Sequence, residues 1–506
     1  MVSRITTVAF NGIEALSVDV QVQLTSGQPS FVIVGLPDKT VAESKERIRA
    51  ALYSFGLSLP AKRIIVNLAP ADLPKEGSHY DLPIALGILV STGIFDEDQL
   101  TAYVALGELG LDGTIAAVVG VLPSAIHANT LGKGLICPEV CGSEAVWASP
   151  DLIIVAGRSL IQLVNHFKGT QLICRPEPVV NTAKPNYLDF KDIKGQVMAK
   201  RALEVAAAGG HNILMIGPPG VGKSMLAERL PSILPPLAPH ELLEVSMLAS
   251  ISGELQGSSL SNRRPFRAPH HSASVAALVG GGTKVKPGEI SLAHHGILFL
   301  DELPEFHPHV LNSLRQPMES GTILIARANL HVVYPARIQL VAAMNPCRCG
   351  RYGELGFRCK RGDRCAGEYR GRISGPLLDR IDITINVPEL STSDLISTNT
   401  CDSSSEIVSR VISVREKQAK RLKLLNGNQQ LNNATMTPAQ VEQIVKLDSS
   451  GRSLMENASK NFKLSARGYH RVLKVARTLA DLDHEENVCR RHLAEAIVYR
   501  GPGNYV

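Results

Sequence analysis

The central motif of this chain is Gly217-Pro218-Pro219-Gly220-Val221-Gly222-Lys223-Ser224, which has the spacing of a phosphate-binding loop. A short apolar run precedes it, and the residues after it are typical of the start of a helix. In such a strand–loop–helix unit, glycine N–H groups and the helix N-terminus surround an anion. The motif therefore predicts that Lys223 contacts nucleotide phosphates and that the Ser224 hydroxyl holds Mg²⁺, the alternative being a glycine turn without a ligand.

A second apolar run ends in two adjacent carboxylates, Asp301 and Glu302. We expect Asp301 to bind Mg²⁺, directly or through water, and Glu302 to polarise the attacking water, since phosphoryl transfer separates these tasks. A third apolar run ends at Asn345. We expect Asn345 to lie beside the glycine loop and contact the γ-phosphate or the water; the alternative is a turn asparagine before Pro346.

The bulk composition is that of a globular chain with room for several domains. The 506 residues are 44% hydrophobic and 20% charged, with a net charge of +6. We find no apolar run of the ~18 residues that a membrane span needs and no secretory signal, so we expect a cytoplasmic protein without membrane contact. The mild positive charge permits nucleic-acid binding without requiring it.

Alternating strand and helix patterns predict an α/β fold. In the first part, strands are expected at 18–24, 30–35 and 63–68, with helices at 39–55 and 82–90. A helix is also expected from Asp192 to Glu204 and a hairpin over 322–333. The predicted domains are an α/β domain at 1–172, a proline-containing linker at 173–190, a nucleotide-binding core with a parallel sheet at 191–395, and a helical lid at 396–506.

The nine cysteines include a cluster of four, Cys347, Cys349, Cys359 and Cys365. Four thiolates suit tetrahedral Zn²⁺, although this spacing is looser than paired C-x-x-C motifs, and four reduced thiols are the alternative. The segment around them is basic and carries interleaved aromatic residues. That composition suits contact with nucleic-acid backbone and bases, or equally a solvated basic loop.

Two arginines are candidates for a nucleotide shared between subunits. Arg380 lies between Asp379 and Asp382, and it is either an arginine finger for a neighbouring γ-phosphate or a member of a local ion pair. Arg467, near the start of a C-terminal helix, is placed where a lid could touch the nucleotide, with Arg471 as the alternative.

The first domain resembles the peptidase domain of Lon-type proteases through the runs 74–81 and 107–123. Laid on that pattern, the nucleophile position falls on His79 and the lysine position falls near Pro123, while Ser78 is one place off. Because the Lon nucleophile depends on a lysine base, we expect the fold to be kept and the peptidase chemistry to be absent.

The order of phosphate loop, insert, Asp-Glu strand, hairpin, sensor asparagine, arginine finger and helical lid resembles an AAA+ ATPase. The runs Arg267-Ala-Pro-His-His271, Asp301-Glu-Leu-Pro-Glu-Phe306 and Ala343-Met-Asn-Pro-Cys-Arg-Cys349 resemble the YifB/ComM family of magnesium chelatase-like proteins. One departure is Arg348, where the family pattern leads us to expect proline.

This resemblance implies a hexameric ring that hydrolyses Mg-ATP, with Gln196 near the adenine. For ComM members it implies ATP-driven branch migration of single-stranded and branched DNA, without sequence preference, in natural transformation. The insert from Arg267 to Lys286 and the hairpin near Arg327 are then expected to grip DNA. The alternatives are a chelatase-type motor that remodels a protein partner for metal insertion, and a scaffold in which ATP only gates assembly.

Overall fold

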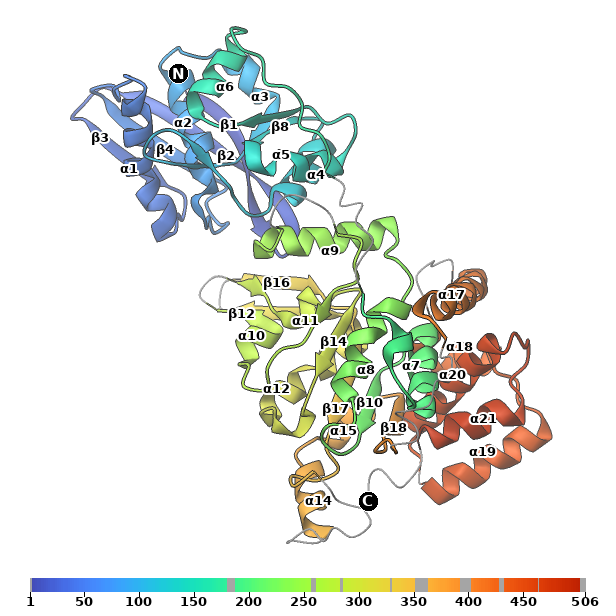
Figure 1. The fold of residues 1–506 in the computed structure, drawn as a ribbon. Helices are drawn as coiled ribbons and strands as arrows, with labels where there is room; N and C mark the ends of the chain where they lie inside the picture. The colour runs from blue at the N-terminus through green and yellow to red at the C-terminus, as the bar shows by residue number, and fades with distance from the viewer. Residues whose placement is uncertain are drawn as a thin grey trace.

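The computed structural model describes residues 2–179, 187–255, 261–282, 285–327, 330–350, 363–391, 402–426, 432–462 and 464–500. An N-terminal α/β region, a central α/β region and a C-terminal group of helices follow one another along the chain (Figure 1). Within these residues we find no helix with both the length and the apolar character needed to span a bilayer.

The N-terminal region is built on a seven-stranded sheet in the order β3-β4-β2-β1-β5-β8-β9. Strands β1 and β2 form a long antiparallel hairpin, whereas β3–β4, β1–β5, β5–β8 and β8–β9 pair in parallel. The sequence analysis identified β2, β3 and β4 but not β1. The strands are β1 (Val2–Asn11), β2 (Glu14–Thr25), β3 (Ser30–Val34), β4 (Arg63–Ala69), β5 (Tyr103–Ala105), β8 (Gly134–Pro138) and β9 (Ile154–Gly157).

The helices of this region cover the sheet and pack close to His79 and Ser78, the two positions compared with the Lon nucleophile. They include α1 (Lys39–Ser54), α2 (Asp81–Ser91) and α4 (Val121–Thr130). His79 is buried, and its ring Nε2 donates to the carbonyl of Val8 at 2.9 Å. Burial lowers the pKa of His79 to about 4. Ser78 donates its hydroxyl proton to the Glu108 carboxylate, so an acid lies against this serine.

The central sheet has five parallel strands in the order β11-β14-β17-β10-β18. Continuous burial of β10, β14 and β17 explains why their sequences are apolar except for Gln339 at the start of β17. Because parallel strands end at one edge, the segments that follow β10, β14 and β17 meet there. The strands are β10 (Ile213–Ile216), β11 (Phe266–Arg267), β14 (Ile297–Leu300), β17 (Gln339–Met344) and β18 (Ile383–Asn386).

The helix before the phosphate loop is shorter than the sequence predicted. Helix α7 (Val197–Gly209) begins at Val197, not at Asp192. The reason is local backbone geometry: Gly195 and Gln196 have φ angles of 59° and 52°, which a right-handed helix excludes.

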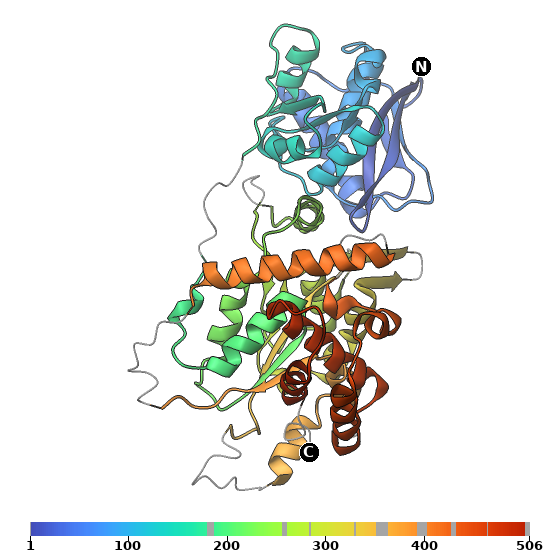
Figure 2. The same ribbon diagram turned by 90° about the vertical axis from the view of Figure 1, so that its right-hand side faces the viewer.

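The C-terminal helices pack on the central region and share one hydrophobic core with it. Helix α20 lies against α7, and α17, coloured orange, crosses one side of the central region (Figure 2). Ser465 caps α20 by accepting a hydrogen bond from the N–H of Gly468. The helices are α17 (Ser404–Asn426), α18 (Pro438–Ile444), α19 (Ser449–Phe462), α20 (Ala466–Leu482) and α21 (Arg490–Val498).

Two elements of the central region lie against the N-terminal region. Helix α9 (Pro239–Ser252) packs on α4 and lies between the two regions in Figure 1. The hairpin of β15 (Thr322–Arg327) and β16 (Leu330–Pro335) forms a small buried cluster with α9, through Leu248, Val332 and Tyr334, against which Ile13 packs. Helix α9, the β15–β16 hairpin and the N-terminal region are therefore in direct contact.

Candidate active site

The phosphate loop lies between β10 and α8 (Lys223–Arg229) at the carboxyl edge of the central sheet. Gly220 and Gly222 adopt φ angles of 82° and 92°, which glycine adopts without strain. The Lys223 ammonium donates to the carbonyls of Gly217 and Pro218, both at 2.7 Å, and to Oδ1 of Asn345 at 3.1 Å. The predicted lysine and sensor asparagine therefore lie side by side.

The two predicted Mg²⁺ residues are also adjacent. The Ser224 hydroxyl donates to Oδ2 of Asp301 at 2.7 Å, and Oδ1 of Asp301 accepts from the N–H of Glu302 at 2.9 Å. Burial lowers the pKa of Lys223, an effect that the charges of Asp301 and Glu302 oppose. A hydroxyl and a carboxylate oxygen beside a lysine form a donor set that suits Mg²⁺ bound to phosphate.

Glu302 has an exposed carboxylate and an unusual backbone conformation. Its φ angle is 51°, a left-handed conformation that costs on the order of 1–3 kcal/mol for a residue with a side chain. The side chain is 52% exposed, and Nδ1 of His271 lies 3.6 Å from its carboxylate. His270 instead contacts the Ser272 hydroxyl at 2.8 Å. The sequence motifs did not reveal the contact between His271 and Glu302, because 31 residues separate the two in the chain.

A cavity of about 200 Å³ adjoins the phosphate loop. Val221, Met225 and Leu226 contribute apolar walls, and Gln196 lies at its border. The Gln196 amide donates to the carbonyl of Pro388 at 2.8 Å, which ties the segment before α7 to the segment after β18. Asp192 and Lys194 also line this cavity, so both apolar and charged side chains face it beside the phosphate loop.

The two predicted arginines lie together at the opposite edge of the sheet. Arg380 precedes β18, whose first residue, Ile383, pairs with the first residue of β10. Its guanidinium forms an ion pair with Glu319, and Arg467 lies 3.5 Å from the same carboxylate. Burial lowers the pKa of Arg380, Glu319 raises it, and the nearby charges of Arg467 and Arg315 lower it. The cluster therefore contains more positive than negative charge.

The local ion pairs considered for Arg380 from sequence are made by other residues. Asp382 is buried and pairs with Arg471, and Asp379 lies 3.6 Å from Arg500. Burial raises the pKa of Asp382, but Arg471 and His211 outweigh it and hold that pKa well below its usual range. The ion pair of Arg471 with Asp382 therefore links α20 to the central region, whereas the side chain of Arg467 is 64% exposed.

Three of the four clustered cysteines lie close together after β17. The Sγ atoms of Cys347, Cys349 and Cys365 lie within 4.8 Å of one another. Cys359 and most of the basic segment predicted to touch nucleic acid lie outside the described residues. The cluster adjoins the phosphate loop, because a Cβ at Gly350 would come within 2.9 Å of Pro219.

Two further clusters have metal-ligating side chains but unsuitable tautomers. In the first cluster, Glu244 of α9 lies close to His294 and His295. Nδ1 of His294 accepts from the N–H of Arg337 at 2.9 Å, so its Nε2 carries the proton and donates to Glu244 at 2.8 Å. Such an Nε2 has no lone pair for a metal. In a second cluster, His492 accepts at Nδ1 from the N–H of Cys489, with the same consequence.

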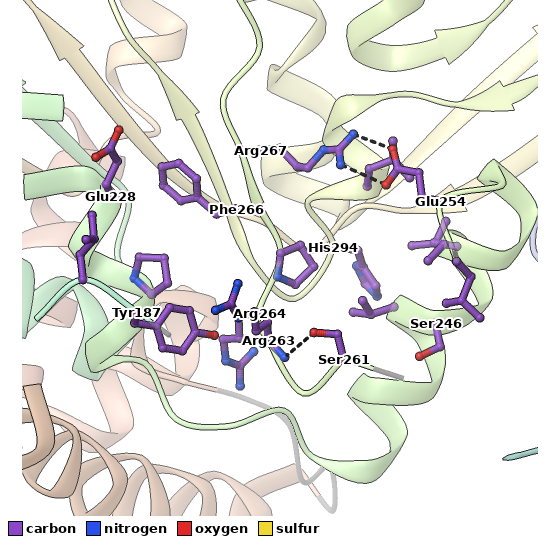
Figure 3. Close-up of a pocket in the computed structure, with 18 residues that line it drawn as sticks. Tyr187, Glu228, Ser246, Glu254, Ser261, Arg263, Arg264, Phe266, Arg267 and His294 are labelled. Atoms are coloured by element: carbon purple, nitrogen blue, oxygen red, sulfur yellow. Dashed lines mark hydrogen bonds and ion pairs between the residues drawn. The ribbon is translucent and has the colours of Figure 1, made fainter. Parts of the chain in front are cut away.

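The basic insert contains an arginine that is fully paired. Arg267 bonds bidentately to Glu254 and to Glu289, at distances from 2.7 to 3.0 Å. Figure 3 shows Arg267 turned toward Glu254 at the rim of a cavity of about 720 Å³. Lys286 is exposed, and the side chain of Arg327 lies outside the described residues. The expected role of Arg267 in gripping DNA is therefore not favoured by its contacts.

The phosphate-loop strand lies between β17 and β18, and a helical region packs beside it. This order of strands around a Walker-type loop is that of the AAA+ class of ATPases. Family models match it: "Magnesium chelatase, subunit ChlI" covers residues 189–395, the corresponding C-terminal model covers 401–500, and "Subunit ChlI of Mg-chelatase" covers 20–140.

Relatives extend the match to almost the whole chain. It is 44% identical to "Competence protein ComM" of Haemophilus influenzae, over 97% of this chain and 95% of that protein. It is 41% identical to YifB of Escherichia coli, over 98% and 97% of the two chains. The chain belongs to the YifB/ComM family of magnesium chelatase-like AAA+ proteins. It is also 25% identical to the DNA replication licensing factor mcm6 of Dictyostelium discoideum, over 40% of this chain and 21% of that protein.

Proposed function

We propose that this chain is the subunit of a hexameric ATPase that moves DNA strands, a branch-migration helicase in recombination and natural transformation. Mg-ATP binds at the carboxyl edge of the central sheet. Lys223 contacts the β- and γ-phosphates, Ser224 and Asp301 hold Mg²⁺, Glu302 polarises the water, and Asn345 positions the γ-phosphate or the water. The motor acts in the cytoplasm, where chromosomal DNA is accessible.

The main support for a ring is the position of the arginine cluster, which consists of Arg380 and Arg467 around Glu319. Arg380 and Arg467 lie at the amino edge of the sheet, while the phosphate loop of the same chain lies at the carboxyl edge. Arg380 Nε is buried and has no hydrogen-bond partner within the described residues. A positive cluster with an unsatisfied buried donor calls for an anion, and the γ-phosphate of an adjacent subunit supplies it. Both arginines then act across a subunit interface.

We propose that the motor acts on DNA for two reasons: the names of its relatives and the position of the β15–β16 hairpin. One relative is named a competence protein, and the core is similar to a replication licensing factor. The β15–β16 hairpin and α9 form a shared cluster outside the central sheet, with exposed Lys286 nearby. Backbone phosphates bind such cations without sequence preference.

A branch-migration assay on synthetic four-way junctions tests this function. The purified chain, ATP and Mg²⁺ are incubated with labelled junctions, and we expect conversion to duplex products and faster ATP hydrolysis when junctions are present. Intact junctions together with DNA-independent hydrolysis would refute the proposal. That outcome would favour the second candidate, a chelatase-type motor acting on a protein partner, which the names of the family models support.

We also propose that the cysteine cluster holds a structural Zn²⁺. The three described thiols, of Cys347, Cys349 and Cys365, converge within 4.8 Å, and Cys359 completes the donor set by sequence. Thiolates are the ligands that structural zinc prefers. The metal would stabilise the segment that packs on Pro219 of the phosphate loop.

A further inference from the structure

Glu319 contacts both interface arginines and belongs to an element that leads into the hairpin. It lies near the end of α13 (Arg315–Ser320), pairs with Arg380 and lies 3.5 Å from Arg467. The carboxylate is 50% exposed, whereas the Arg380 side chain is 5% exposed. A half-exposed acid therefore holds a buried arginine at the edge where a neighbouring subunit would dock.

The backbone after Glu319 leads into the hairpin without a flexible spacer. Gly321 makes the turn, with a φ angle of 68°, and β15 begins at Thr322. The carbonyl of Gly321 accepts from the N–H of Ala336, just beyond the other strand of the hairpin, at 2.8 Å. A side chain at Gly321 would meet Arg337 at 3.0 Å, so the turn is tightly packed. A displacement of α13 is therefore transmitted to the base of the hairpin.

The charges at the cluster make Glu319 a competitor of the incoming phosphate. Arg380 donates to Glu319 through one terminal nitrogen and to the carbonyl of Pro376 through the other. A guanidinium that turns toward a γ-phosphate gives up its carboxylate partner, because both acceptors require the same planar donor edge. The carboxylate, being half exposed, can be rehydrated when it is released.

We propose that Glu319 is a positioning residue that couples the nucleotide of the adjacent subunit to the hairpin of its own subunit. It holds Arg380 and Arg467 while the neighbouring site lacks a γ-phosphate. When the arginines engage that phosphate, Glu319 is released, and α13 with the base of β15–β16 moves. Phosphate release restores the ion pair. This inference rests on the proposed function, in which the arginines act between subunits and the hairpin contacts DNA.

The test compares Glu319→Gln and Glu319→Asp with wild type in the full-length assembled protein. The matched control is Glu46→Gln, which removes a carboxylate 3.3 Å from Arg49 on an exposed face of α1. The turnover number and KM for ATP are measured with and without four-way junctions, together with the strand movement per ATP hydrolysed. Glutamine keeps the shape of the side chain and removes its charge, and aspartate keeps the charge.

We expect Glu319→Gln to keep or raise DNA-independent turnover, because the arginines are no longer restrained. Its stimulation by junctions should fall toward one-fold, and strand movement per ATP should fall severalfold. Glu319→Asp should recover at least part of both, and Glu46→Gln should match wild type. Unchanged stimulation and unchanged movement per ATP in Glu319→Gln would overturn the inference. Parallel loss of all activities in both Glu319 variants would overturn it too, since that is the signature of a merely structural residue.

Arg380→Ala separates this failure from failure of the proposed function. If Arg380→Ala keeps full turnover, the intersubunit role of the arginine is wrong and the coupling has no basis. If Arg380→Ala abolishes turnover while Glu319→Gln behaves as wild type, the motor stands and only the role of Glu319 is rejected.

Discussion

Mixing two inactive variants tests whether the arginine cluster serves a neighbouring subunit. Lys223→Ala removes the phosphate-loop lysine, and Arg380→Ala removes the proposed arginine finger; we expect each change alone to abolish hydrolysis. We expect a loss of about 10³-fold or more for Arg380→Ala, as for other arginine fingers. On the proposed ring, we expect co-expressed subunits to form mixed rings in which some interfaces combine the intact lysine of one chain with the intact arginine of the next.

The expected recovery follows from the strand register. Ile383 pairs with Ile213, and the phosphate loop begins after Ile216, so the strand alone separates the two edges by about 10 Å. The Arg380 side chain is in addition held at its own edge by Glu319. We therefore expect Arg380 to act on the nucleotide of a neighbouring chain and not on that of its own chain. With random mixing in equal amounts, roughly one interface in four has both intact halves, so about a quarter of wild-type hydrolysis should return.

Steady-state ATP hydrolysis with saturating ATP and junction DNA measures this recovery. The matched control mixes Lys223→Ala with Glu302→Gln, because both residues belong to the same side of the interface and no mixed interface restores both. A first mixture that stays at the average of its inactive parents would refute action between subunits. Equal recovery in the control mixture would refute the assignment of Lys223 and Glu302 to one side.

Three further predictions concern single sites. Glu302→Gln should keep ATP binding in a nucleotide-binding titration and lose about 10²–10⁴-fold in turnover, and undiminished hydrolysis would remove Glu302 from its role as base. Asp382→Asn should lower the free energy of unfolding by about 3–5 kcal/mol in a urea titration, because Arg471 loses its buried partner. Folding lowers the pKa of Asp382, so its contribution to the free energy of unfolding should be complete above the unfolded pKa of about 4. That contribution should decline as the pH falls below this value. A difference between wild type and Asp382→Asn that does not change with pH would contradict this prediction. Cys365→Ser should reduce the zinc content measured by elemental analysis from about one equivalent, whereas equal content in wild type and variant would reject the zinc site.

A comparison of predicted and observed element bounds shows which features the local sequence can predict. Hairpin β15–β16 matches the predicted span 322–333 closely, and β17 ends directly before Asn345, where the apolar run ends, because alternation and apolar runs are short-range properties. The start of α7 was misplaced by five residues, because nothing in the apolar pattern reports the positive φ of Gln196. Strand β1 was missed, although its pairing with β2 covers its entire length.

The choice of ionic partners could not be predicted from the sequence. Arg380 has acidic neighbours on both sides in the chain, yet it pairs with Glu319, which is 61 residues away. Asp382 is matched instead with Arg471, at a separation of 89 residues. The sequence indicates that Arg267 is a cation available to bind DNA, but in the structure it forms ion pairs with Glu254 and Glu289. Each partner is chosen by packing between elements that are distant in the chain.

The sequence alone predicted a nucleotide site, because the phosphate loop and the Asp-Glu pair are contiguous motifs. Parallel strand topology then brings such motifs to one edge wherever their strands pair. The placement of Arg380 and Arg467 at the opposite edge, their common contact with Glu319, and the link from Glu319 to the hairpin emerged only from the folded chain. These contacts depend on long-range burial and charge, which no window of neighbouring residues contains.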